Sequence, residues 1–518
     1  MTSETDLIVA RAPGVPEIDG ALAGAYTARD GEVTEIDRSY YDTFDALLRA
    51  GGHSLVWERG RLRLERRDSR LSEAAEVLAE RPAAPFFARD LPPGELRDAL
   101  GGAVEVRALL PLARVRARTE LVRILDAELK TVVRLEIESP QLVTAGPPRP
   151  LSVRIRLRGV RGYDRQLARV RGTLLASLAL SDDPVPLVDE ATIAAGGRPE
   201  GVGNKVDVPL EAGERADAAA VAVLRRLLQI MDANLAGTVA DTDAEFLHDY
   251  RVAIRRTRSV QRELRGVFAP AELARLRTEF RWLQQATSDA RDLDVYVLEF
   301  DAMRAMLPEQ LRADLDPVLG VLRGRRLIAR GEMVRSLRSD RATALLADWR
   351  ALLASLTELP DDDRPDAKRP IGALSSRRIR KVYRRMVAMG EAIGRDASGA
   401  APAEYHELRK TGKELRYLLE LFGTPLHDAE VVRPMIRSLK ALQDVLGRHQ
   451  DREVQVAMLQ GLRDEVSALP AGARALMAMG VLVERLDEDA AAARGEFAEV
   501  FAAFSSRRRR KLVRETFA

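Results

Sequence analysis

The sequence contains no cysteine in its 518 residues. Disulfides, iron–sulfur clusters, thiolate zinc sites and cysteine nucleophiles are therefore excluded. It also lacks an uninterrupted apolar run long enough to cross a membrane, which takes about 18 residues. Its first residues are acidic, whereas a secretory signal peptide begins with basic ones. These absences lead us to expect a soluble cytoplasmic protein.

Aromatic residues and lysines are scarce. Aromatic residues make up 5% of the chain, and only eight of its 82 basic residues are lysine. A bias towards arginine indicates nothing by itself, so the informative question is whether the arginines cluster where helix geometry would focus their charge. With 46% hydrophobic and 31% charged residues, a chain of this length is expected to form two or three domains with real cores.

Residues 1–200 have the character of a sheet domain. Residues 131–138 are rich in β-branched side chains, and residues 152–158 alternate strictly between apolar and basic side chains, which is typical of a half-exposed strand. Breaks rich in glycine and proline separate such segments. We predict an α+β domain dominated by antiparallel sheet.

The remainder has the character of a helical bundle. Residues from about 184 to 214 contain several prolines and glycines with little periodicity, and predict a linker. Beyond residue 214 apolar positions recur every three or four residues, as in amphipathic helices. A proline-rich break at 360–370 divides this all-α domain, expected over 214–505, into parts at about 214–356 and 371–505. A basic C-terminal tail, expected to be a solvated terminus, follows at 506–518.

The helical half contains an internal repeat. The segments at 246–258 and 404–416 both fit the pattern His-x-x-Arg-x-x-x-(Arg/Lys)-x-x-Arg, at an offset of 158 residues. A Leu-Gln pair followed by an acidic turn ending in Val recurs at 283–295 and 442–454, at an offset of 159. The pairs Arg225-Arg226 and Arg384-Arg385 also align at 159. Three blocks in register indicate a duplicated bundle.

Each copy places its cations along one face of a helix. At 100° per residue, the pattern's four positions fall within roughly an 80° arc. The first stripe is therefore His248, Arg251, Arg255 and Arg258, extended by Arg262, and the second is His406, Arg409, Lys413 and Arg416. Tyr250, Ile254 and Leu264 lie opposite the first stripe, and Leu408, Leu415, Leu419 and Phe422 opposite the second, where they are expected to pack the bundle.

The stripes favour an anionic ligand. Like charges three and four residues apart destabilise an isolated helix by a few tenths of a kcal/mol per pair. Two copies with the same spacing therefore suggest that an anion offsets this cost. A solvated helix face, neutralised by neighbouring acidic side chains, is the structural alternative. We expect no metal role, because neither a second histidine nor a carboxylate pair was recognised at ligand spacing from these histidines.

A third basic helix precedes the second copy. Residues 377–385 contain six cations and no acid, including Arg384 and Arg385. Together with the two stripes this predicts a long cationic surface or groove. Its ligand should be a long anion with closely spaced charges, and the planar guanidinium fork suits phosphate oxygens better than an ammonium group does.

This pattern resembles the CHAD domain, the conserved histidine α-helical domain, over roughly residues 214–505. The resemblance implies a pseudo-symmetric helical bundle that binds inorganic polyphosphate through a basic central groove. Carried over by position, the implied ligands are His248, Arg251, Arg255, Arg258, His406, Arg409, Lys413 and Arg416. Arg384 and Arg385 are added on charge and location alone. The resemblance implies no catalytic residue, metal or cofactor.

The N-terminal domain resembles a CYTH (triphosphate tunnel) domain, an antiparallel barrel, in a degenerate form. Residues 40–51 resemble its strand entry and residues 116–120 its basic strand. The defining Glu-x-Glu-x-Lys is missing from residues 6–11, and Arg154-Ile155-Arg156 places arginines where metal-binding carboxylates are expected. Glu136 and Glu138 form one Glu-x-Glu pair, interpreted as part of a structural strand. These departures from the CYTH pattern imply that the domain is catalytically inactive.

The sequence therefore favours a non-enzymatic, cytoplasmic polyphosphate-binding protein, in association with polyphosphate granules. One alternative is a triphosphate or polyphosphate hydrolase that uses a residual CYTH tunnel. Another is a general polyanion or nucleic-acid binder, against which no aromatic side chain interleaves the stripes as a stacking platform.

Overall fold

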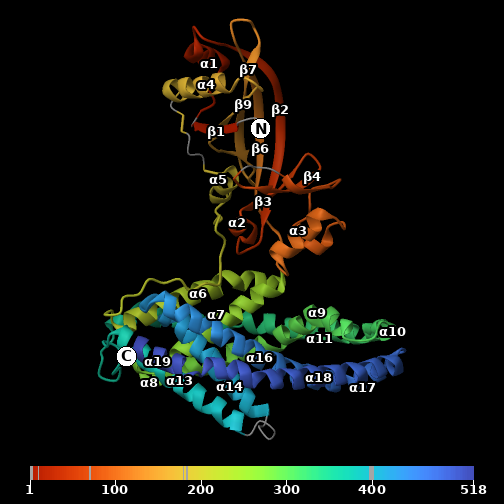
Figure 1. Cartoon of the computed structure of the whole chain (residues 1–518), viewed down its shortest axis with the longest axis vertical. Helices are drawn as coiled ribbons and strands as arrows, with labels where there is room; N and C mark the ends of the chain where they lie inside the picture. The colour runs from red at the N-terminus through yellow and green to blue at the C-terminus, as the bar shows by residue number, and fades with distance from the viewer. Residues whose placement is uncertain (1–3, 10, 69–71, 179, 182–184, 396–401) are drawn as a thin grey trace. The chain divides into compact units, whose positions relative to one another are not determined.

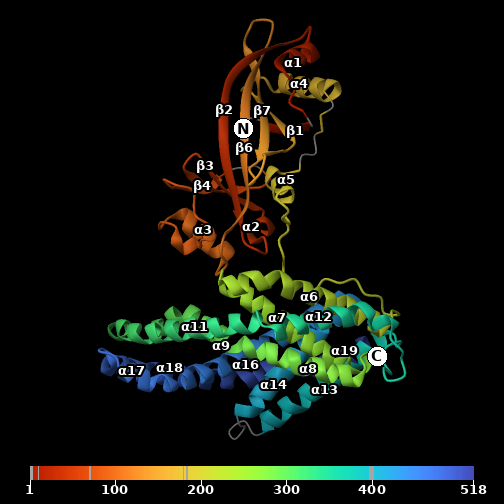
Figure 2. The same ribbon diagram turned by 180° about the vertical axis from the view of Figure 1, so that it is seen from behind.

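The computed structural model divides the chain into two compact units, Met1–Gly203 and Asn204–Ala518 (Figure 1, and from behind in Figure 2). The structure describes residues 4–9, 11–68, 72–178, 180–181, 185–395 and 402–518. No helix within these ranges is both long and apolar enough to cross a membrane.

An antiparallel sheet forms the frame of the first unit. Its strands are β1 (Glu4–Val9), β2 (Thr27–Asp42), β3 (His53–Glu58), β4 (Arg61–Arg66), β5 (Ser72–Val77), β6 (Leu110–Leu125), β7 (Thr131–Leu142), β8 (Arg149–Pro150) and β9 (Val153–Gly159). The order is β1-β9-β7-β6-β2-β3-β4-β5, with β8 beside β7. The helices are α1 (Val15–Leu22), α2 (Leu47–Ala50), α3 (Glu95–Val104), α4 (Asp164–Ser177) and α5 (Leu187–Ala194), with a 3-10 turn at Ala88–Asp90. The predicted antiparallel-sheet domain is confirmed.

The alternating segment at 152–158 forms strand β9, but the expectation that it is half-exposed is wrong, because Arg154 on its basic face is only 3% exposed. Val153, Ile155 and Leu157 are buried, and Ile155 lies opposite Ile137 of β7. Their face of the sheet packs against α1 and α4, which contribute Ile18 and Val170 to the same apolar cluster. The period of two therefore fixes which face of this strand is covered.

The predicted linker at 184–214 is wrong over residues 187–194, which form helix α5. Leu187, Val188 and Ala191 pack into an apolar cluster with strand residues of the first unit. Asp189 accepts a hydrogen bond from Arg67 at 2.7 Å, and both acids of α5 lie in its first turn, where they favour the positive end of the helix dipole. A helix this short shows too few turns for its period to be recognised. Residues 182–184 lie outside the described ranges.

The second unit is helical, as predicted. Its helices are α6 (Ala216–Ala240), α7 (Ala244–Glu263), α8 (Pro270–Ala286), α9 (Ser288–Ala305), α10 (Glu309–Arg312), α11 (Asp316–Leu337), α12 (Asp340–Ser355), α13 (Ile371–Arg395), α14 (Pro402–Leu418), α15 (Thr424–Leu426), α16 (Ala429–Gly461), α17 (Arg463–Ser467), α18 (Gly472–Phe504) and α19 (Arg507–Thr516). Short 3-10 turns lie at Arg265–Val267, Ala313–Leu315 and Leu356–Glu358, and a π-helical turn at Leu419–Gly423 continues α14.

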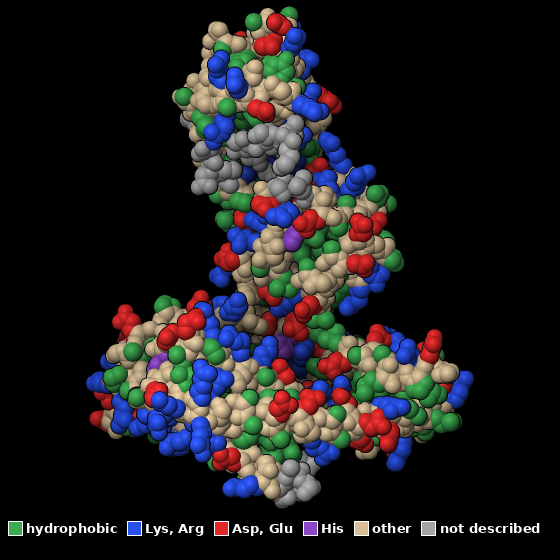
Figure 3. Space-filling model, in the orientation of Figure 1, with side chains coloured by type: hydrophobic (Ala, Val, Ile, Leu, Met, Phe, Trp, Pro, Cys, Tyr) green, Lys and Arg blue, Asp and Glu red, His purple; other side chains and the backbone are tan. Residues whose placement is uncertain are grey.

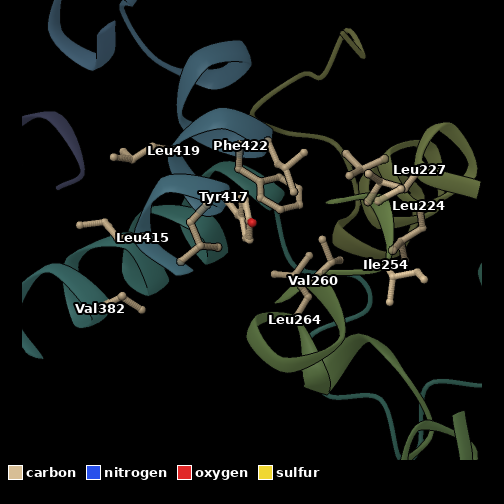
Figure 4. Close-up of a cluster of buried hydrophobic side chains, with 14 of the residues drawn as sticks. Leu224, Leu227, Ile254, Val260, Leu264, Val382, Leu415, Tyr417, Leu419 and Phe422 are labelled. Atoms are coloured by element: carbon tan, nitrogen blue, oxygen red, sulfur yellow. The ribbon is translucent and has the colours of Figure 1, made fainter. Parts of the chain in front are cut away.

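The main core of this unit joins the two repeats (Figure 4). Leu224 and Leu227 of α6 face Ile254 and Val260 of α7, and Phe422 enters from the second copy. The apolar residues expected opposite the stripes are all buried: Tyr250, Ile254 and Leu264 in the first copy, and Leu408, Leu415, Leu419 and Phe422 in the second. A separate apolar cluster joins α9 and α11 of the first repeat to α16 and α18 of the second.

A buried arginine holds the break between the repeats. The side chain of Arg364 is fully buried, and it donates to the backbone oxygens of Leu356 and Pro360, each at 2.8 Å. Its Nη1 also lies 3.6 Å from Asp217 of α6. A segment without helical periodicity is thereby fixed against the bundle, because each of these donors finds an acceptor away from water.

The C-terminal residues, expected to be a solvated terminus, form helix α19 at 507–516, in which most of the cations are exposed. Its Val513 and the following Phe517 are buried in the main core, and the Phe517 ring lies edge-on to His427 at 4.7 Å between centroids. Ser506 caps the helix by accepting from the backbone N–H of Arg509. The run of arginines conceals the four-residue spacing of the two apolar anchors.

Candidate functional site

The two striped helices, α7 and α14, are joined by reciprocal ion pairs. Arg256 of α7 donates to Glu420 at 2.8 Å, and Arg262 of α7 lies 3.0 Å from Glu414 of α14. At the repeat offset of 158, Arg256 corresponds to Glu414 and Arg262 to Glu420. Each contact is therefore the image of the other under the pseudo-two-fold relation, with the charges exchanged. The repeats meet at the helices that carry the stripes.

Arg251 is the most deeply buried cation of the first stripe. It is 7% exposed, and its Nη1 donates to the backbone oxygen of Gln284 at 2.9 Å and to Thr287 Oγ1 at 2.7 Å. Burial, followed by repulsion from Arg255, lowers its pKa to about 10. These contacts fix the turn between α8 and α9, so Arg251 has a structural role whatever it binds.

Arg258 and Arg416 each donate to the equivalent glutamine of their own repeat. Arg258 donates to the side-chain oxygen of Gln284, and Arg416 donates to that of Gln443 at 2.9 Å. Both glutamines belong to the repeated Leu-Gln motif. Burial, and then repulsion from Arg281, lowers the pKa of Arg258. A neutral amide holds each arginine in place. Arg416 also lies 3.4 Å from Glu420, whereas Arg258 lies in no ion pair within the described ranges, so the charge of Arg258 is the one left without a counter-charge.

Lys413 and Arg255 carry the least compensated charges. Burial, followed by repulsion from Arg409 and Arg255, lowers the pKa of Lys413 to about 8, although Asp451 opposes this shift. Arg255 has a buried Nε without a hydrogen-bond partner, and within the described ranges it lies in no ion pair shorter than 4 Å. The pKa of Lys413 is low first because burial disfavours the charged form, and then because the neighbouring arginines repel it.

The histidines lie in different surroundings. His406 Nδ1 lies 2.8 Å from the side-chain oxygen of Gln450, which orients its ring. His248 lies between Glu245 and Asp249, and one ligand atom from each of the three residues falls within 4.8 Å of the others. The expectation that no carboxylates stand at ligand spacing is therefore wrong for His248. Asp249 accepts from Asn204 at 2.6 Å, and Glu245 lies 3.6 Å from Arg291, so both carboxylates already have partners.

Arg384 and Arg385 point to different parts of the bundle. Arg385 donates to Glu414 at 2.5 Å and so lies beside the striped helices. Arg384 instead lies over its own helix, with Nε 3.4 Å from the backbone oxygen of Arg380. Neighbouring residues on a helix are about 100° apart, which explains the divergence.

Acidic residues whose role the sequence did not indicate face the stripes. Asp451 accepts from Arg409 at 3.0 Å, and Asp292, its repeat equivalent, opposes the lowering of the Arg251 pKa. Burial raises the pKa of Asp292. The acidic turn that recurs in the sequence could have indicated these residues, which place negative charges opposite the cations of the stripes. We refer to Arg251, Arg255, Arg258, Arg409, Lys413 and Arg416, with His248 and His406, as the central basic site.

Both carboxylates of the Glu-x-Glu pair in the first unit lie beside arginines. Glu138 forms an ion pair with Arg38, which also pairs with Glu58, and Glu136 lies 3.5 Å from Arg156. Arg154 donates to Glu190 of α5 at 2.7 Å. The Glu136 and Glu138 pair thus takes part in a structural ionic network on the sheet.

Comparisons with known proteins match the helical unit. The CHAD domain family model matches residues 222–460. A search of curated proteins found no match. Among solved structures, the CHAD domain from the plant Ricinus communis is 23% identical, with a TM-score of 0.47, and the match covers 57% of this chain and 96% of that one. PptA from Streptomyces chartreusis is 18% identical, with a TM-score of 0.42, covering 56% and 99%.

A third solved structure is HpAC1 from Hippeastrum, described as having a dominant triphosphatase activity. It is 15% identical, with a TM-score of 0.24, and the match covers 38% of this chain and 97% of that one. The family match spans both striped helices and both repeated Leu-Gln motifs. Residues 222–460 therefore form a CHAD domain, the conserved histidine α-helical domain that the duplicated stripe resembles.

Proposed function

We propose that this protein binds inorganic polyphosphate at the central basic site. The observation that carries the proposal is the uncompensated charge at Lys413 and Arg255. The pKa of Lys413 is lowered to about 8, and those of Arg251 and Arg258 are lowered as well. A bound anion would reverse these shifts, and the free energy recovered would contribute to binding.

The chemistry of the site favours phosphate. Arginine offers a planar fork of donors that matches phosphate oxygens, and the site has five arginines beside one lysine. Aromatic residues on the two helices are not available for base stacking, since Tyr250, Tyr405 and Tyr417 are only 1%, 5% and 5% exposed. A polymer recognised by charge density alone, such as polyphosphate, therefore suits the site better than single-stranded nucleic acid does.

The experiment is a binding titration across a salt series, with long-chain polyphosphate, tripolyphosphate and single-stranded DNA as probes. The site variant is Arg255→Gln/Lys413→Met, which removes two charges without touching the contacts of Arg251. The control is Arg323→Gln/Arg338→Gln, which removes two exposed charges at α11. We expect polyphosphate binding in the wild type and the control, and its loss in the site variant. Equal binding of DNA would indicate a general polyanion surface instead.

We further propose that the first unit is a CYTH-like domain that does not hydrolyse its ligand. A triphosphate tunnel holds divalent metal on free carboxylates, whereas Glu136 and Glu138 are paired with arginines. Incubation with tripolyphosphate and Mg²⁺ or Mn²⁺ should therefore release no phosphate. A cytoplasmic location on polyphosphate granules belongs to the same proposal, and imaging of a fluorescent fusion tests it.

A further inference from the structure

Helix α19 carries positive charge that its own structure does not neutralise. Six of its ten residues are cations, and five of them occupy its first five positions. Cations at a helix N-terminus oppose the helix dipole, and like charges one turn apart repel each other. Arg510 donates to Glu391 at 2.5 Å and Lys511 lies 3.7 Å from Glu515. Arg507, Arg508, Arg509 and Arg514 have no ion pair within the described ranges.

The helix is held firmly despite this charge. Val513 and Phe517 are buried, and the Nε of Arg510 donates to the backbone oxygen of Ser505 at 2.6 Å. The cations are therefore displayed on a fixed element, which lowers the entropic cost of binding an extended anion.

Helix α13 carries further cations on the face that contacts α19. Glu391, which binds Arg510 of α19, lies seven and eleven residues after Arg384 and Arg380, so the three share one face within roughly 40°. Neither Arg380 nor Arg384 forms an ion pair within the described ranges. Figure 3 shows Lys and Arg side chains gathered at the end of the helical unit where Figure 1 places α8, α13 and α19.

Helix α13 also contacts the two helices that carry the central basic site. Arg385, one residue after Arg384, donates to Glu414 of α14, which in turn lies beside Arg262 of α7. Arg385 of α13 and Arg262 of α7 therefore share Glu414. Arg384 and Arg380 lie on the adjacent face of α13, which Glu391 joins to α19. A polymer that leaves the central basic site along α13 would meet Arg384 and Arg380 before α19.

The character of this surface restricts its ligand. Tyr383 and Phe517, the aromatic residues of α13 and of the α19 segment, are buried, so no base-stacking platform accompanies the arginines. Helix α19 also lies outside residues 222–460, the range that matches the CHAD domain. We propose that α19 and the facing stripe of α13 form an outer phosphate-binding surface for the part of a long polyphosphate chain that extends beyond the central basic site. This inference rests on the proposed function.

The test uses the full chain and the variant Arg507→Gln/Arg508→Gln/Arg509→Gln, which keeps the cap and both apolar anchors. The matched control is Arg323→Gln/Arg335→Gln/Arg338→Gln, which removes three exposed charges at α11. Long-chain polyphosphate should bind the α19 variant about fivefold to tenfold more weakly than the control. The slope of log K against log salt should fall by about two, using the coefficient for single strands. Tripolyphosphate, which under the proposed function is bound by the central basic site alone, should bind both variants equally, and the melting temperature should not fall.

Each contrary outcome overturns a distinct statement. Long-chain polyphosphate that binds the wild type and the α19 variant equally well would overturn the outer surface and leave the proposed function standing. A wild type that binds neither polyphosphate probe would overturn the proposed function itself. A lower melting temperature, or loss of tripolyphosphate binding, would show that α19 acts through the fold. Selective loss of DNA or anionic-vesicle binding would assign the surface to another polyanion.

Discussion

Replacing Lys413 by methionine should stabilise the free protein. Burial and the neighbouring Arg409 and Arg255 lower the pKa of Lys413 from 10.5 to about 8, so the charged form is unfavourable in the folded state. Each tenfold change in a proton equilibrium corresponds to about 1.4 kcal/mol, and the shift from 10.5 to about 8 therefore costs about 3 kcal/mol at neutral pH. Lys413→Met removes the charge and retains most of the side-chain volume, and we expect it to raise the free energy of unfolding by up to that amount.

The gain should depend on pH in a defined direction. Below pH 8 the lysine is charged in both the folded and the unfolded states, and only the folded state bears the cost. Between pH 8 and 10.5 the folded state loses the proton first, so wild-type stability rises with pH towards that of the variant. Urea unfolding of both proteins at neutral pH and near pH 10 would measure the difference. Lys410→Met is the control, because Lys410 is exposed and pairs with Glu407 at 2.7 Å.

The same substitution should weaken polyphosphate binding. Above pH 8 the free protein holds Lys413 largely neutral, and a bound phosphate raises its pKa again, so binding takes up a proton. Calorimetric titration in two buffers of different ionisation enthalpy detects that proton in the wild type, and should detect none through this position in Lys413→Met. Affinity of the wild type should fall as the pH rises above 8.

The reasoning would be refuted by a Lys413→Met variant that is less stable than the wild type. Such a result would mean that protein groups such as Asp451 already satisfy the ammonium group, and that the site does not require an external anion. Stabilisation without any loss of polyphosphate binding would instead separate the buried charge from the ligand.

Three further substitutions test the contacts around the site. Burial and a hydrogen bond shared with Glu263 raise the pKa of Glu414 to about 7, so this group contributes stability below pH 4.5 that is lost as the pH rises to 7. The variant Glu414→Gln should therefore make the melting temperature less dependent on pH over that range. An unchanged dependence on pH would contradict the shared proton. Arg251→Lys keeps the charge but loses the contacts to Gln284 and Thr287, and urea unfolding should show a loss of about 2 kcal/mol, whereas no loss would remove its structural role. Arg364→Ala should destabilise by about 3–5 kcal/mol in the same assay, because it leaves Asp217 and several buried carbonyl oxygens without this partner; a loss below about 1 kcal/mol would contradict that account.

The sequence predicted the striped helices because their signal is local and occurs twice. Helical spacing placed the cations on one face and Tyr250 and Leu415 on the other, and both of these residues are buried. The equivalence of Arg258 and Arg416 also followed from the duplication, because each copy brings its own glutamine. Local periodicity is sufficient to assign a face, since neighbours along a helix are fixed by its geometry.

The distribution of charge within the site could not be predicted in this way. Arg256 and Arg262 have acidic partners only because α7 packs against α14, and the paired residues are 152 to 164 positions apart in the chain. Lys413 and Arg255 lack comparable partners for the same reason. Helices α5 and α19 were missed because two turns give little periodic signal, and because charge dominates the composition of α19. The local sequence determines which residues form a stripe, whereas the net charge of the stripe depends on the tertiary contacts of those residues.

Because some cations of the striped helices have acidic partners and others do not, the fold can hold mutually repelling cations close together. The contacts of Arg256 with Glu420 and of Arg262 with Glu414 join the repeats at the striped helices, and neither contact uses a cation of the central basic site. Asp451 partly neutralises Arg409 in the free protein, so a polyphosphate chain bound as proposed would compete with Asp451 for that arginine. This competition would lower the affinity at each phosphate, while in the free protein the ion pair reduces the repulsion among the stripe cations. Under the proposed function, a long polymer would offset this cost because it gains many such contacts at once, whereas a single small anion would not, and the site would then favour long chains.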